Sequence, residues 1–149
     1  MPRATVEQVN NSCINIDNEE WRNIPGYEDI YQVSSLGRVK HLSTTIVEVS
    51  SSGEVIASRL TREYILKQCT NNQSYLHVGL VKDNKTNSIG VHRLVALAFV
   101  PKLIEQTEVH HIDSNRQNNT LTNLMWLAPE MHCSYHTTKR RYKALLAAR

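Results

Sequence analysis

Apolar and polar residues alternate over short runs in the middle of this chain, a period of two that is typical of β-strands. The runs fall at residues 31–34, 38–40, 64–67, 75–81 and 88–91, and residues 44–55 are rich in β-branched side chains. Turn-forming residues separate them at 25–26, 37, 50–53 and 82–85, and the last of these predicts a hairpin. We therefore predict a small antiparallel sheet between residues 44 and 91. Apolar residues then become dense at 92–100, which predicts a buried helix that Pro101 ends.

The C-terminal part has a different order of elements. Residues 109–112 and 124–127 are strand-like, and the polar tract 114–120 between them is typical of a loop. After Pro129 the sequence predicts a helix, with Glu130 near its start and basic residues toward its end. A strand, a loop, a strand and a helix should therefore follow one another.

Histidine and asparagine side chains are concentrated in these last elements. His110 and His111 lie in the first strand-like run, Asn123 precedes the second, and His132 lies in the predicted helix. An imidazole is neutral near physiological pH and can take a proton from water, and two further side chains can hold a divalent cation. An amide can fix the loop between the strands. This set of residues indicates a metal-dependent phosphodiesterase.

The same stretch resembles the HNH nuclease motif, the ββα-metal fold of homing endonucleases. The matching residues, in the family's order, are Val109-His110-His111-Ile112-Asp113-Ser114-Asn115, then Asn118-Asn119-Thr120-Leu121-Thr122-Asn123-Leu124-Met125-Trp126, then Met131-His132. Two positions depart from the family's pattern: Ser114 replaces a glycine and Met131 replaces a glutamate. Neither is a catalytic position, so the departures affect the expected loop geometry more than the chemistry.

The resemblance extends upstream. Residues 21–28 and 31–40 are similar to the small module that precedes HNH domains in phage homing endonucleases, and residues 91–100 to the helix that leads into the nuclease. It implies an α+β fold, with a ββα-metal motif at the C-terminal end preceded by small antiparallel β-sheet elements. The expected parts are a loosely ordered tail (1–18), a β-rich DNA-binding module (19–90) and the HNH nuclease domain (91–149) with a basic C-terminal helix. At 149 residues the chain should form one compact unit, or two small modules that share a surface.

The resemblance also assigns roles. It implies that His111 is the general base, that His110 and His132 are metal ligands, and that Asn123 holds the loop by backbone hydrogen bonds. One divalent cation is expected, and Mg²⁺ should support activity. Two imidazole ligands shift the preference toward Mn²⁺ or another transition metal. The sequence leaves open a metal role for Asp113 and, as another alternative, a structural zinc site formed by His132, Cys133 and His136. His92 is expected to be structural.

The charge is distributed unevenly along the chain. Residues 1–58 contain 4 Lys/Arg and 8 Asp/Glu, a net charge of −4, whereas residues 59–149 contain 13 and 6, a net charge of +7. A polyanionic partner would explain this distribution, because phosphate contacts supply most non-specific affinity for DNA. The alternatives are a solvated basic helix and lysines that protect a sheet edge. The residues predicted to contact DNA are Arg38, Lys40, Arg59, Arg62, Lys67, Lys82, Lys85, Arg116, Lys139, Arg140, Arg141 and Lys143.

Composition narrows the setting. The chain contains no apolar run of about 18 residues, so no membrane span is predicted. The N-terminus lacks the pattern of a secretory signal. The three cysteines form no C-x-x-C pair, which favours a reducing compartment such as the cytoplasm of a host cell. We expect a phage-type, site-selective endonuclease that cuts double-stranded DNA to 5′-phosphate and 3′-hydroxyl ends, acting as a monomer or alternatively as a dimer. The rival functions are a catalytically silent DNA-binding protein and a non-specific nuclease or ribonuclease of the same fold.

Overall fold

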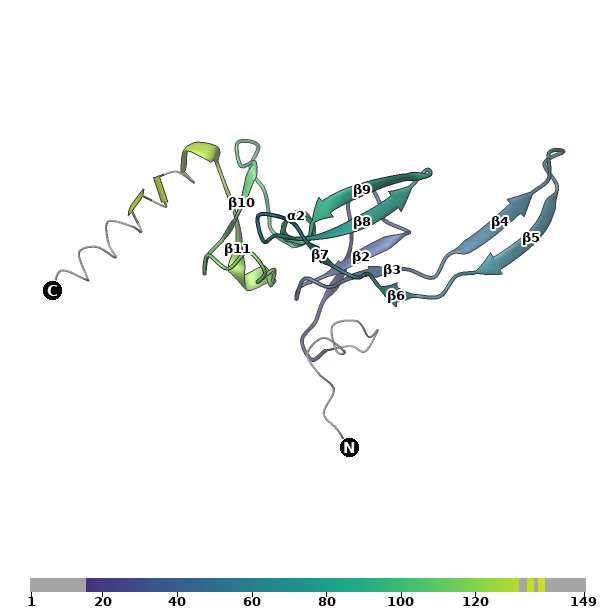
Figure 1. The fold of residues 1–149 in the computed structure, drawn as a ribbon, viewed down its shortest axis with the longest axis horizontal. Helices are drawn as coiled ribbons and strands as arrows, with labels where there is room; N and C mark the ends of the chain where they lie inside the picture. Colours follow the sequence, from purple (N-terminus) through teal and green to yellow (C-terminus); the bar gives the residue numbers. More distant parts are fainter. Residues whose placement is uncertain (1–15, 132–133, 136, 139–149) are drawn as a thin grey trace, which may run out of the picture.

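The structure is a computed structural model that describes residues 16–131, 134–135 and 137–138 (Figure 1). In chain order its elements are β1 (Trp21–Asn23), β2 (Tyr31–Ser34), β3 (Val39–His41), β4 (Thr45–Val49), β5 (Val55–Leu60), β6 (Tyr64–Ile65), β7 (Cys69–Thr70), β8 (Leu76–Lys82), β9 (Lys85–Gly90), α2 (Val91–Phe99), β10 (Glu108–His111), the 3-10 turn η1 (Leu121–Asn123) and β11 (Leu124–Leu127). The predicted α+β fold is confirmed. Most of the predicted N-terminal tail, residues 1–15, lies outside the described residues.

The strands form several small antiparallel sheets rather than one. The described strands are ordered β1-β2-β3-β6, β4-β5, β7-β8-β9 and β10-β11. The prediction of a single sheet for residues 44–91 is therefore wrong. Each strand there was recognisable from its own alternation. However, β6 pairs with the earlier strand β3, and the β4–β5 hairpin between them projects from the molecule as an exposed arm (Figure 1). Alternation identifies a strand but not its partner.

Helix α2 lies at the centre of the molecule and joins the parts (Figure 1). Its apolar face is buried and packs in one cluster with Val33 and Val39 of the four-stranded sheet, Leu80 of β8 and Leu124 of β11. Each fully buried aliphatic side chain of this kind contributes about 1.5–3 kcal/mol. The predicted helix is thus confirmed, and its core draws residues from both of the predicted domains.

Several connections carry left-handed backbone conformations, and three of them bear on the predictions. Asp83 and Asn84, with φ of 51° and 58°, form the predicted hairpin turn between β8 and β9, as a two-residue type I′ turn requires. Gly37 has φ of +85° in the β2–β3 connection. Ser114 has φ of 67° at the position where the HNH pattern has glycine, so the serine keeps the backbone geometry that glycine would favour.

A helical segment follows β11. Residues 129–131, 134–135 and 137–138 are helical, which confirms the predicted helix over the residues that the structure describes. Among the described residues, no helix has both the length and the apolar composition needed to cross a bilayer.

Candidate active site

The two adjacent histidines lie at the end of β10, where the chain enters the loop that joins β10 to β11. His110 pairs with Met125 and His111 with Leu124, and the two histidines are only 3% and 5% exposed. Because successive side chains of a strand point to opposite faces, the two rings meet different elements. His110 makes an edge contact with Tyr135 of the last helical segment, with ring centroids 4.7 Å apart. The hairpin therefore separates two chemical environments.

His111 lies in a cluster of polar and aromatic side chains. Its Nε2 atom is 3.0 Å from Oδ1 of the buried Asn119. Its ring centroid is 5.3 Å from that of His92 and 5.9 Å from that of Tyr75. An amide oxygen only accepts hydrogen bonds, so the ring hydrogen is placed on Nε2 and Nδ1 is left as the basic nitrogen of the neutral ring.

Asn123 closes the loop between β10 and β11. Its Oδ1 atom accepts a hydrogen bond from the Asp113 amide (3.0 Å), and its Nδ2 atom donates to Asp113 Oδ1 (2.9 Å) and to the Asn118 carbonyl (2.8 Å). These are contacts that fix a loop. The predicted importance of Asn123 for catalysis stays a prediction.

The Asp113 carboxylate is occupied by the same loop. It accepts hydrogen bonds from Asn118 Nδ2 (2.7 Å) and the Asn115 amide (2.7 Å) as well as from Asn123. The bond from Asn118 is the largest cause that lowers the pKa of Asp113, followed by the Asn115 amide. Asp113 is therefore a loop-stabilising residue in this structure.

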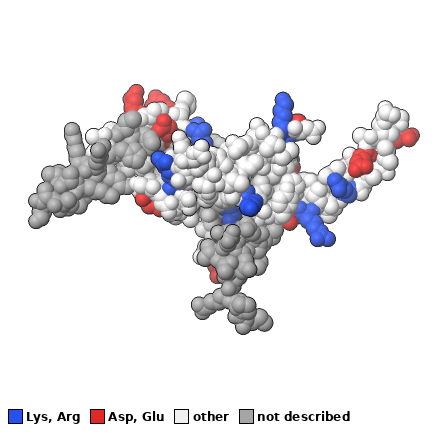
Figure 2. Space-filling view, in the orientation of Figure 1, with Lys and Arg blue, Asp and Glu red and all other residues white. Residues whose placement is uncertain are grey.

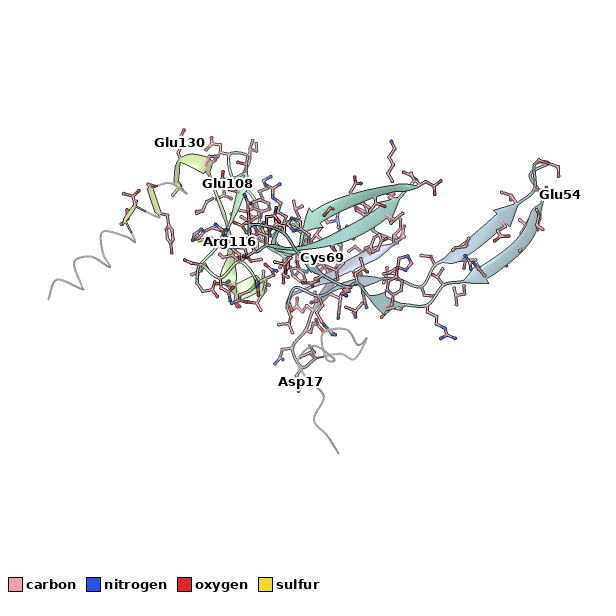
Figure 3. The ribbon with its side chains drawn as sticks, viewed as in Figure 1. Asp17, Glu54, Cys69, Glu108, Arg116 and Glu130 are labelled. Atoms are coloured by element: carbon pink, nitrogen blue, oxygen red, sulfur yellow. The ribbon has the colours of Figure 1, made fainter. Side chains whose placement is uncertain are left out.

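The β7–β8 loop of the predicted DNA-binding module also reaches the site. Tyr75 contacts His92 with ring centroids 4.8 Å apart. Arg116, labelled in Figure 3, extends from the loop after β10, stacks over Tyr75 at 4.9 Å and donates from Nη1 to the Gln73 carbonyl at 2.9 Å. Tyr75 was missed in the sequence because this contact exists only in the tertiary fold. Asn119 was visible there only as one letter of the motif.

His92 is a buried neighbour of the predicted base. Burial, together with smaller contributions from the nearby His111, Arg93 and His77, lowers the pKa of His92 to about 4. The His92 ring is therefore neutral at physiological pH and places no positive charge beside His111.

The predicted metal site is only partly described. His110 is in place, whereas His132, and with it Cys133 and His136 of the alternative zinc site, lies outside the described residues. Within the described part of the chain, no three His, Cys, Asp or Glu side chains are grouped to hold a metal ion. The donor that is present fits a divalent cation, since neutral imidazole is an ordinary ligand for such ions.

One predicted DNA contact, Arg38, is enclosed in this structure. Arg38 is buried, its guanidinium forms a bidentate ion pair with Glu19, and it lies 5.3 Å from the Trp21 ring. A side chain so enclosed is a structural residue. A strand position next to a turn looked exposed in the sequence, but both of its sides are covered here.

The other predicted DNA contacts are spread over the surface rather than gathered on one sheet face (Figure 2). Lys40 lies over Trp21 at 4.5 Å with Nζ 3.4 Å from Glu63, and Lys82 donates to the Gly26 carbonyl at 2.6 Å. Lys40 is half-buried, whereas the exposed residues of this set are Arg59, Arg62, Lys67, Lys82, Lys85 and Arg116. Lys139, Arg140, Arg141 and Lys143 lie outside the described residues.

Family models match two parts of the chain. Residues 19–81 match the NUMOD4 motif and residues 90–132 match the HNH endonuclease model. The chain therefore belongs to the HNH endonucleases, with a NUMOD4 motif in front of the HNH motif.

Within this family the chain is homologous to phage HNH homing endonucleases. It is 33% identical to the DNA endonuclease I-HmuI of Bacillus phage SP01 over 113 residues, which are 76% of this chain and 55% of that protein. It is 31% identical to the H-N-H endonuclease F-TflII of Escherichia phage T5, over 62% of this chain and 48% of that protein. A solved structure on DNA binding and cleavage by the HNH homing endonuclease I-HmuI matches with a TM-score of 0.61 and 31% identity, over 87% of this chain and 66% of the other. The chain thus spans about half the length of these two curated relatives.

Proposed function

We propose that this chain is a site-selective DNA endonuclease of the HNH homing type. It hydrolyses phosphodiesters of double-stranded DNA to 5′-phosphate and 3′-hydroxyl ends and uses one divalent cation. The observation that carries the proposal is the buried His111, bonded through Nε2 to Asn119 inside the HNH loop. The relatives support DNA as the substrate, since DNA endonuclease and DNA cleavage appear in their names.

His111 acts as the general base in this proposal. Its Nδ1 lone pair takes a proton from a water molecule as the water oxygen bonds to phosphorus, and the bond from phosphorus to the 3′ oxygen breaks. A positioned imidazole of ordinary basicity accelerates such a step by about 10²- to 10⁴-fold. Because the neighbouring His92 ring is neutral, it does not repel the positive charge that His111 acquires.

His110 and His132 hold the cation. His132 is the second ligand that the HNH motif implies, and neutral imidazole is an ordinary ligand for a divalent cation. When bound, the cation neutralises charge on the phosphate and the leaving oxygen. Mg²⁺ is the ion expected from its abundance, and the imidazole ligands favour Mn²⁺ or another transition metal.

The exposed basic residues bind the DNA backbone. Arg116 lies beside the proposed site, because it stacks over the Tyr75 ring, which in turn contacts the His111 ring. Lys40, Arg59, Arg62, Lys67, Lys82 and Lys85 contribute from the N-terminal part, and Lys139, Arg140, Arg141 and Lys143 from the C-terminal end. The protein acts as a monomer on DNA in the cytoplasm of a host cell.

Nicking of supercoiled plasmid tests the proposal. The chain should convert plasmid that contains phage genomic fragments to open-circle or linear form with Mg²⁺ or Mn²⁺, and EDTA should stop the reaction. Mapping the cuts across a phage genomic library should give a small set of sites, with ends that a ligase joins directly. Binding without any cut would indicate the catalytically silent protein. Equal cutting of RNA or random DNA would indicate a non-specific nuclease.

A further inference from the structure

We propose that Asn119 positions the general base, and that the β2–β3 turn at Gly37 holds Asn119 in place. This inference rests on the proposed function, because it concerns how His111 is presented. It assigns the NUMOD4 part of the chain, residues 19–81, a role in building the catalytic site in addition to DNA binding.

Asn119 makes one side-chain hydrogen bond among the described residues, and that bond goes to His111. Both residues are buried, at 4% and 5% exposure, and the Oδ1–Nε2 distance is 3.0 Å. Its Nδ2 atom is buried without a hydrogen-bond partner in the described part of the chain. An unpaired buried group costs about 1–3 kcal/mol, so the Asn119 side chain adds little net stability. Its contribution is to fix the orientation and tautomer of the His111 ring.

Gly37 presses against the backbone of Asn119. A Cβ atom added at Gly37 would lie 3.0 Å from Asn119 Cβ and 3.1 Å from Asn119 O. Gly37 also has φ of +85°, a conformation that side-chain-bearing residues rarely adopt. A side chain at Gly37 would therefore require the loop at Asn119 to shift by a few tenths of an ångström, in addition to the strained φ.

Hydrogen bonds hold the same turn on both of its sides. The Ser35 carbonyl accepts from the Leu121 amide at 2.7 Å, two residues beyond Asn119. The Gly37 carbonyl accepts from Gln68 Nε2 at 2.7 Å, just beyond strand β6. The turn is thus fixed from the N-terminal part and docks on the loop that carries Asn119. A displacement of the turn would therefore move Asn119, and through Asn119 it would change the position of the His111 ring.

The first arm of the test uses Asn119 itself. Asn119→Ala should lower the single-turnover cleavage rate by about 10- to 100-fold, the size found when the hydrogen-bond partner of a metal-ligating histidine is removed, while DNA affinity and melting temperature change little. Asn119→Asp keeps an acceptor oxygen and should recover most of the rate. In a His111→Ala background, Asn119→Ala should have no further effect. A cleavage rate of Asn119→Ala within about threefold of wild type would overturn the inference, given that range.

The second arm uses a pair of matched glycines. Gly37→Ala introduces both backbone strain and the clash with Asn119, and it should lower the cleavage rate. Gly53→Ala introduces the same kind of strain, with φ of +87°, but its added Cβ meets nothing within 4 Å. It should cleave like wild type. Equal cleavage by the two variants would contradict the proposed role of the turn, whichever of them is the less stable.

A spectroscopic arm separates this inference from the proposed function. Long-range ¹H–¹⁵N spectra of neutral His111, assigned by its loss in His111→Ala, should show hydrogen on Nε2 and a ring N–H protected from exchange. Asn119→Ala should remove that protection. This signature would persist in a protein that cleaved no DNA, in which case the proposed function alone would fail. Hydrogen on Nδ1, or an unchanged spectrum of Asn119→Ala, would overturn the inference about Asn119.

Discussion

The carboxylate of Glu19 is paired with the guanidinium of Arg38, and the two side chains are 0% and 4% exposed. Burial opposes ionisation of Glu19, but the hydrogen bonds from Arg38 and Ser34 and the Arg38 charge outweigh it and lower the pKa of the carboxyl. The pair joins the residues before β1 to the start of β3, next to the turn that contacts the HNH loop.

Removal of one partner should leave a buried charge uncompensated. Glu19→Ala is expected to lower the free energy of unfolding by about 3–5 kcal/mol. The control is Glu20→Ala, since Glu20 forms an exposed pair with Arg22 at 3.7 Å and should cost at most about 1 kcal/mol. Denaturant titration measures both. Equal losses for the two variants would mean that the Glu19–Arg38 pair has no special structural weight.

The buried His92 should make stability depend on pH. In the unfolded chain His92 titrates near 6.5, whereas in the folded protein its pKa is about 4. Between these pH values the unfolded chain binds more protons than the folded protein. The contribution of His92 to the free energy of unfolding is therefore fully present above pH 6.5 and is lost as the pH is lowered toward 4. His92→Gln should flatten the fall of the unfolding midpoint between about pH 6.5 and 4.5, a window above the range in which carboxyl groups titrate. An identical pH slope in wild type and His92→Gln would contradict the neutral, buried state of His92.

The metal ligands should affect metal affinity rather than DNA affinity. His110→Ala and His132→Ala should each raise the metal concentration needed for half-maximal cleavage by about tenfold or more, with partial recovery at high Mn²⁺. His41→Ala is the control, because His41 stacks with Tyr64 in the four-stranded sheet. Cleavage measured against Mg²⁺ and Mn²⁺ concentration gives the result. Unchanged metal curves for both variants would remove these histidines from the metal site.

The basic C-terminal segment should bind DNA without reading bases. Replacing Lys139, Arg140, Arg141 and Lys143 by Ala should weaken binding to target and random DNA alike. The slope of log affinity against log salt should become shallower by about one unit for each DNA phosphate that the variant no longer neutralises. Arg59→Ala, on the exposed arm, serves as a single-charge comparison. A salt slope equal to that of wild type would show that the four charges are only solvated.

Local patterns in the sequence predicted local structure well. The α2 helix, the Asp83–Asn84 hairpin and the β10 and β11 strands were recognisable because periodicity and turn chemistry act over a few residues. The sheet arrangement was not, since β6 reaches back past the arm to β3. The burial of Arg38 likewise depends on Glu19 and Trp21, which fold over it from an earlier strand region.

The candidate site divides in the same way. His110, His111 and Asn123 were found because they belong to one contiguous motif. Tyr75 and Gly37 were not, because only the tertiary fold brings the β7–β8 loop and the β2–β3 turn against that motif. The packing of Gly37 against Asn119 therefore could not be predicted from spacing.

The most direct test of the central claim is the cleavage rate of His111→Ala. This variant should bind DNA with nearly wild-type affinity, because the proposed DNA-binding residues are unchanged. Its single-turnover cleavage rate with Mg²⁺ should fall by about 100- to 10,000-fold, the usual loss on removal of a general base. A cleavage rate within about threefold of wild type, far outside that range, would contradict His111 as the base and with it the proposed active site.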